Sequence, residues 1–150
     1  MTIRLATLPD APNLLAFLVA LTAESAYTQT AVPDRAGMAI RLDQLLRNPD
    51  AGFVVAEDHG GGIVGLFAIL LYDDLISGER AVAQICWYTV PSNRRGLGPR
   101  LLAHGLEWAR EHGATRIQML APEEKFAQFY RRRGYTLTNR VYEGRLPCRG

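Results

Sequence analysis

Two apolar segments separated by a glycine-rich turn place the strongest constraint on this fold. Residues 53–57 and 63–72 are rich in β-branched, aromatic and long aliphatic side chains, and Asp-His-Gly-Gly-Gly at 58–62 joins them. Turn residues between two runs of this kind predict a β-hairpin. A polar loop at 73–79 precedes another strand-like run at 81–90. The centre of the chain therefore predicts an antiparallel sheet.

Helical patterns lie on both sides of this sheet segment. Asp10 can cap a helix with Pro12 in its first turn, and Leu14, Leu18 and Leu21 then share one face. The other predicted helices start after Asp34 and end at Asn48-Pro49, cover 98–112 before Gly113, and cover 123–133 before Gly134.

The remaining strand candidates are 3–7, 116–120, 135–138 and 141–146. The predicted order is then β-α-α-β-β-β-α-β-α-β-β, a mixed α/β fold with one central sheet flanked by helices. A chain of 150 residues fits one domain, so residues 1–150 are expected to form one.

Composition excludes several classes of protein. The net charge of +2 calls for neither a nucleic acid nor an anionic membrane as partner. Cys86 and Cys148 do not form a metal-spaced pair, and Cys86 lies in an apolar run typical of a core. Arg4 and Asp10 flank too short an apolar stretch for a signal peptide, and no run reaches the length of a membrane span. A cytoplasmic protein is expected.

The segment 90–102 carries the first chemical signal. It runs from a strand through an Arg/Gly turn into a helix, and a helix N-terminus exposes unpaired N–H groups that bind phosphate. Gly96 and Gly98 let the backbone approach a ligand, and nearby arginines add charged donors. The chain has no GxxxxGK[ST] motif, so it has no phosphate-binding loop of the nucleoside triphosphatases. Gly96-Leu97-Gly98 lacks the third glycine of the dinucleotide-binding fingerprint. Alone, the motif also fits an arginine-bearing turn without a ligand.

A second motif, Phe-Tyr-Arg-Arg-Arg-Gly-Tyr at 129–135, follows about thirty residues later. With Asn-Arg-Arg-Gly-Leu-Gly at 93–98, it resembles the GCN5-related N-acetyltransferase (GNAT) family. That family's signature is a strand, [Q/R]-x-x-G-x-[G/A] before a helix, and a later helix ending in Y-x-x-x-G-[F/Y]. Asn93 occupies the first position of this signature, where the family has glutamine or arginine. A one-residue deletion between Pro91 and Gly96, relative to the family, would put Arg94 there instead. The resemblance covers nearly the whole chain.

The resemblance implies where acetyl-coenzyme A would bind as co-substrate. Strand 81–90 would splay from strand 116–120, and the pantetheine arm would enter the gap. Tyr130 matches the tyrosine that donates a proton to the departing thiolate; helical spacing equally permits a core aromatic beside Phe126 and Phe129. The implied coenzyme-binding residues are Tyr88, Thr89, Val90, Asn93, Arg94, Arg95, Gly96, Leu97, Gly98, Pro99, Arg100, Phe126 and Tyr130.

The implied reaction is direct attack of an amine on the thioester in a ternary complex, without a metal. An amine of lysine type has a pKa near 10.4 and must lose a proton first. Candidate bases are Glu24, Asp73, Asp74 and Glu79, with a water chain as the alternative. Glu24 is the predicted base, and Glu24, Tyr27 and Asp73 are the predicted acceptor-binding residues.

Two other functions are compatible with parts of this pattern. A non-catalytic sensor would bind acetyl-CoA without turnover. A small nucleic-acid-binding protein would use the arginines, but the low net charge argues against it. The acceptor is expected to be a small-molecule or peptide amine. The sequence leaves open which amine it is, whether acyl groups other than acetyl are transferred, and whether the chain forms a homodimer.

Overall fold

The computed structural model describes residues 1–24 and 32–147. These residues form a five-stranded mixed sheet whose strands lie side by side in chain order. Neighbours are antiparallel from β1 to β4, whereas β4 and β5 are parallel. The strands are β1 (Thr2–Leu5), β2 (Ala51–Glu57), β3 (Ile63–Asp73), β4 (Arg80–Thr89) and β5 (Arg116–Gln118).

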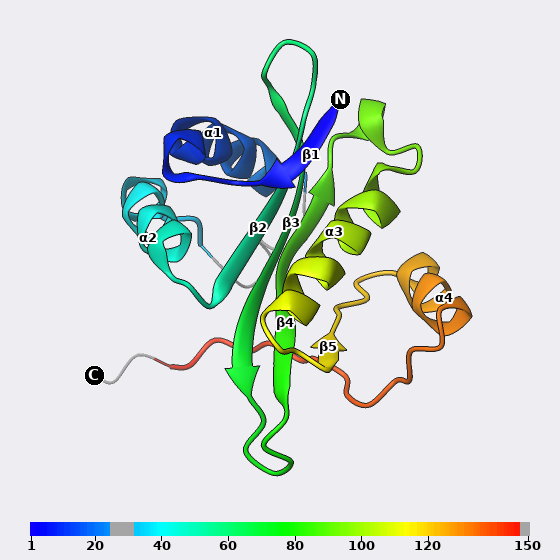
Figure 1. Ribbon diagram of the computed structural model, residues 1–150. Helices are drawn as coiled ribbons and strands as arrows, with labels where there is room; N and C mark the ends of the chain where they lie inside the picture. Colours follow the sequence, from blue (N-terminus) through cyan, green and yellow to red (C-terminus); the bar gives the residue numbers. More distant parts are fainter. Residues whose placement is uncertain (25–31, 148–150) are drawn as a thin grey trace.

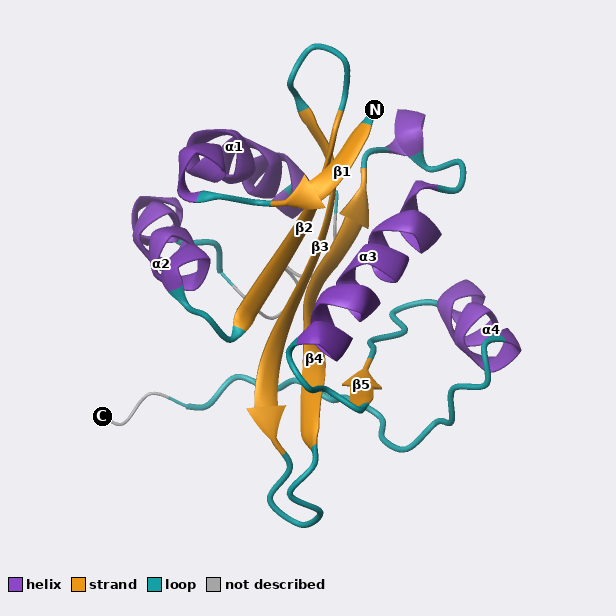
Figure 2. Ribbon diagram, viewed as in Figure 1, coloured by secondary structure: helices purple, strands orange, loops and turns teal. Residues whose placement is uncertain are grey.

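Helices cover both faces of the sheet (Figure 1). The helices α1 (Ala11–Thr22) and α2 (Arg35–Arg47) pack on one face, and α3 (Leu97–Glu111) crosses the other. The short helix α4 (Glu124–Arg132) follows β5 (Figure 2), and rings from it contact Trp87 of β4. The predicted mixed α/β fold and its element order through this helix are confirmed.

Strand alternation divides the interior into two cores. On β2, Val54 and Ala56 pack into the core under α3, while Phe53 and Val55 pack into the core under α1 and α2. Cys86 of β4 packs against the second core, as its apolar surroundings predicted. Burial there raises the pKa of its thiol to about 12.

The two predicted helix caps have different outcomes. Asp34 caps α2 as expected, because its carboxylate accepts a 3.1 Å hydrogen bond from the N–H of Gly37. Asp10 does not cap α1; its carboxylate accepts bonds from the N–H of Thr7 at 2.7 Å and from two guanidinium nitrogens of Arg4 at 2.8 Å. The prediction for Asp10 was therefore wrong, and this residue instead ties β1 to the turn before α1.

The two predicted C-terminal strands are also absent from the described residues. The chain from 135 to 147 forms neither helix nor strand, and its apolar side chains Leu137, Val141, Tyr142 and Leu146 are exposed. Local alternation predicts an extended backbone, but a strand also needs a neighbour whose N–H and C=O groups pair with its own. β5 has only three residues and supplies no long edge.

Candidate active site

A bulge in β4 shapes the middle of the sheet. Ala68 of β3 lies opposite Cys86, and Ile69 lies opposite Gln84, so Ile85 is an extra residue without a partner. A bulge of this kind bends its strand and reverses the alternation of side chains beyond it. Trp87 therefore faces α3, where its ring contacts Phe67.

The strands β4 and β5 separate at this bulge. Their pairing ends where Ala83 lies opposite Gln118. Beyond that point the N–H of Leu120 donates a 3.0 Å hydrogen bond to the side-chain oxygen of Gln84. A side chain of β4, and not its backbone, therefore holds this part of the chain. The backbone pairing of β4 and β5 thus ends where the family resemblance implies that the two strands splay.

Only alternate N–H groups of β4 point into this gap. The N–H of Val90 donates to the carbonyl of Val64 on β3 at 3.0 Å. Because N–H groups alternate in direction along a strand, that of Tyr88 also points to β3, whereas those of Trp87 and Thr89 point toward the gap. Among the three backbone positions predicted there, only Thr89 presents its N–H to the gap. Trp87 was missed, since no local pattern marks the bulge.

The predicted phosphate turn leads directly into α3. The 3-10 helix η3 (Pro91–Asn93) follows β4, and Gly96 then takes a left-handed conformation with φ of +69° at the N-cap of α3. Gly96 has no side chain to cap the helix, so the N–H groups of Gly96, Leu97 and Gly98 have no partner within it. Pro99 contributes no N–H group. These donors and the helix dipole suit an anion.

The arginines of the turn do not all lie together. Arg95 and Arg100 are exposed, the first before Gly96 and the second in the first turn of α3. Arg94 instead lies over the ring of Tyr88, with its guanidinium carbon 5.8 Å from the ring centre. Its Nε donates to the carbonyl of Thr89 at 3.3 Å.

Tyr130 lies where β5 leaves the sheet. Its hydroxyl donates a 2.8 Å hydrogen bond to the carbonyl of Leu120, and the residue is 7% exposed. Burial, with a smaller effect from Tyr135, raises the pKa of its phenol, so the group keeps its proton. The residue is thus a buried aromatic and also has its hydroxyl at the edge of the gap.

An aromatic cluster connects α4 to the sheet. The ring of Trp87 lies 6.0 Å from Phe126, 5.7 Å from Phe129 and 6.2 Å from Tyr130, measured between ring centres. Phe126, a predicted coenzyme contact, therefore lies next to the residue whose N–H faces the gap. Its half-buried ring also has the Lys125 ammonium 5.3 Å from its centre.

The predicted acceptor residues separate in space. Glu24, just after α1, accepts a hydrogen bond from the hydroxyl of Tyr88. Asp73 lies opposite Arg80 at the hairpin end of β4, eight residues from Tyr88, or roughly 25 Å along the strand. It does not share a site with Glu24. Tyr27 lies outside the described residues.

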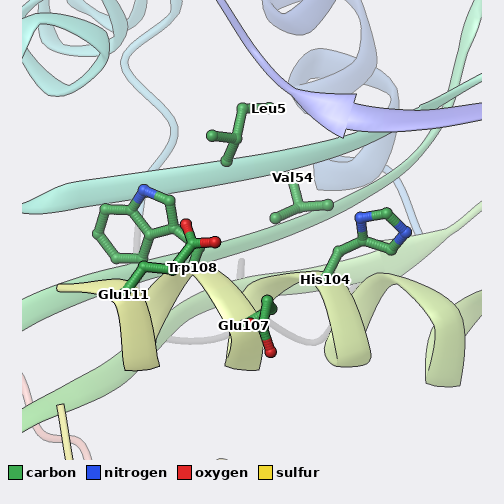
Figure 3. A pocket seen from close by; sticks show the side chains of 6 residues that line it. All are labelled: Leu5, Val54, His104, Glu107, Trp108 and Glu111. Atoms are coloured by element: carbon green, nitrogen blue, oxygen red, sulfur yellow. The ribbon is translucent and has the colours of Figure 1, made fainter. Parts of the chain in front are cut away.

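Two hollows lie away from these groups. One, with a volume of about 170 Å³, is bordered by Leu5 and Val54 from β1 and β2 and by α3 side chains, among them His104, Glu107 and Trp108 (Figure 3). The second, of about 190 Å³, lies between the end of α3 and β5, near Ile117 and Tyr135. Neither is lined by Thr89, Gly96 or Tyr130.

The described ranges contain neither a candidate metal site nor a membrane-spanning helix. In residues 1–24 and 32–147, no three His, Cys, Asp or Glu side chains are grouped as a metal site requires. None of the helices there has the length and hydropathy to cross a membrane.

Comparison with known proteins agrees with this geometry. Residues 18–135 match the family model described as Acetyltransferase (GNAT) family, which is more than half of the chain. The chain belongs to the GNAT family. No curated protein matched the sequence.

Solved structures of GNAT proteins share the fold at low sequence identity. A ribosomal-protein-alanine N-acetyltransferase from Brucella melitensis biovar Abortus 2308 is 21% identical, with 97% of this chain and 100% of that chain covered at a TM-score of 0.71. An aminoglycoside acetyltransferase from an uncultured soil metagenomic sample, solved with sisomicin, is 18% identical over 99% and 96% of the two chains at 0.73. The acetyltransferase AAC(6')-Iy, solved with a CoA bisubstrate analogue, is 20% identical over 98% of each chain at 0.70.

Proposed function

We propose that this GNAT protein transfers an acetyl group from acetyl-CoA to an amine by direct attack in a ternary complex. One observation carries the proposal: the gap between β4 and β5 opens beside the uncapped start of α3, with the Tyr130 hydroxyl at its edge. Residues 1–150 would act as one catalytic domain in the cytoplasm, without a metal.

The start of α3 would hold the diphosphate of the coenzyme. The N–H groups of Gly96, Leu97 and Gly98 supply directed donors, and Arg95 and Arg100 supply mobile charge. The left-handed backbone at Gly96 puts no side chain over these donors, which supports the assignment of an anion to this turn.

The gap would hold the reacting end of the coenzyme, which supplies an activated thioester. The N–H groups of Thr89 and Trp87 are the donors available to the carbonyl oxygen as it gains negative charge. Tyr130 would donate its proton, or a hydrogen bond, to the departing sulfur. Its raised pKa keeps the phenol protonated but makes it a weaker acid, which favours a hydrogen bond to the sulfur over full proton transfer.

The acceptor would approach from the α1 side of β4. Glu24 is our candidate for the base, since its exposed carboxylate ends α1 and bonds to Tyr88 of the same strand. It could take the proton directly or through water. The aminoglycoside and ribosomal-protein neighbours differ widely in substrate, so they support an amine acceptor only as a class.

A thermal-shift panel with acetyl-CoA, CoA and NAD would test coenzyme binding first. A ligand at 100 times its dissociation constant stabilises the folded state by about 2.7 kcal/mol. We expect this response to acetyl-CoA and none to NAD. An amine screen that detects released CoA thiol then tests turnover. Binding without turnover would favour the sensor alternative, and no response to any CoA would contradict both.

A further inference from the structure

Tyr88 joins two opposite charges on the α1 face of β4. The bulge at Ile85 turns Tyr88 to this face, where its ring packs edge-on against Phe17 of α1 with 5.6 Å between ring centres. Its hydroxyl donates to Glu24, and the Arg94 guanidinium lies over its ring. A carboxylate and a guanidinium thus flank one phenol.

The two charges do not neutralise each other. Among the ion pairs of residues 1–24 and 32–147, none joins Glu24 to Arg94 or involves either one. Arg94 uses Nε on the carbonyl of Thr89 and also interacts with the Tyr88 hydroxyl, and the remaining N–H groups of its guanidinium are left for another anion. Glu24 uses one oxygen on Tyr88, which leaves the second for a cation.

The position of Arg94 also separates it from the proposed diphosphate site. Trp87 and Tyr88 point to opposite faces of β4, and α3 lies on the Trp87 face. Because Arg94 folds back onto Tyr88, its guanidinium belongs to the α1 face rather than to the first turn of α3.

We infer that Arg94 binds an anionic group of the acceptor, so that the acceptor is an amine that also carries a carboxylate, as amino acids do. Glu24 would receive the ammonium end and Arg94 the carboxylate, with the Tyr88 ring between them. This inference rests on the proposed function and names the substrate class of the same site.

Matched pairs of amines provide the test. Alanine and β-alanine are each compared with ethylamine, and γ-aminobutyrate with propylamine; each amino acid differs from its alkylamine by one carboxylate. The carboxylate also changes the basicity of the amine, so the readout is how a variant changes the ratio of kcat/KM within a pair. We expect Arg94→Gln to lower that ratio about tenfold or more for the best pair, as losing a charged hydrogen bond does.

Arg95→Gln is the matched control, because it removes the same charge one residue further along the turn. It should raise the Kd for acetyl-CoA and leave the ratio unchanged, whereas Arg94→Gln should leave that Kd within about twofold. An Arg94→Gln variant that binds acetyl-CoA as weakly as Arg95→Gln would overturn the inference. An unchanged ratio, or turnover of alkylamines alone, would overturn it as well. Failure of the wild type to bind acetyl-CoA would instead contradict the proposed function itself.

Discussion

The hydroxyl of Tyr130 donates to the carbonyl of Leu120, whose own N–H donates to the side chain of Gln84. Leu120 is therefore held by two side chains at the point where β5 turns away from β4. The same hydroxyl that we assign to the departing sulfur therefore also contacts the residue beside which the two strands part.

Tyr130→Phe should separate chemistry from binding. We expect kcat to fall about 100-fold, as the loss of a proton donor does, while the Kd for acetyl-CoA stays within about twofold. Steady-state kinetics and calorimetric titration measure the two quantities. Tyr135→Phe is the control, because its ring stacks on Tyr130 at 5.7 Å and should change kcat little. An equal fall in kcat in Tyr130→Phe and Tyr135→Phe would count against a catalytic role for Tyr130.

Gly96→Ala should weaken coenzyme binding. A Cβ at φ of +69° strains the backbone by about 1 kcal/mol, and relaxing that strain would turn the α3 donors away from the anion. We expect the Kd for acetyl-CoA to rise at least about tenfold. Gly78→Ala is the control, since Gly78 has φ of +71° in the hairpin loop far from the turn. The Gly78→Ala variant should lose a similar free energy of unfolding and keep the wild-type Kd for acetyl-CoA.

Asp10→Asn should destabilise the fold in a pH-dependent way. The Arg4 guanidinium, through hydrogen bonds, holds the pKa of Asp10 well below its usual range. A lowered folded-state pKa contributes stability above the unfolded value near 4, and this is lost as pH falls toward the folded value. We expect a loss of about 2 kcal/mol at pH 7 that shrinks below pH 4.

Urea unfolding of both proteins at pH 7, 4 and 3 measures this difference. Asp43→Asn, which breaks the exposed pair with Arg47, should leave the free energy of unfolding almost unchanged at each of these pH values. If the difference in free energy of unfolding between Asp10→Asn and the wild type were the same at all three pH values, the linkage would be refuted.

Trp87→Ala should loosen α4 without unfolding the sheet. The rings of Phe126, Phe129 and Tyr130 contact the sheet at Trp87, so its removal leaves α4 with few anchors. We expect amides of α4 to exchange roughly thirtyfold faster, which corresponds to about 2 kcal/mol. Amides of β2 and β3 provide the internal reference, and their equal acceleration would show global destabilisation instead.

Most elements were readable from the sequence because their signals are local. The Asp34 cap, the glycine turn between β2 and β3 and the Gly96 turn each depend on a few adjacent residues. The predictions that failed concern pairing. Asp10 pairs with Arg4 of β1, which also bonds Glu57 of β2, and residues 135–147 pair with no strand.

The sequence by itself determined the order of strands and helices as far as α4, the Arg/Gly turn before α3 and the place of Tyr130 near the end of α4, since propensity and spacing act over short distances. Only the tertiary structure decided which β4 groups face the gap and where Arg94 lies. Without the bulge at Ile85, strict alternation would put Tyr88 on the same face as Val82, under α3. One unpaired residue reverses that face, and its place depends on the register against β3, which no local pattern encodes.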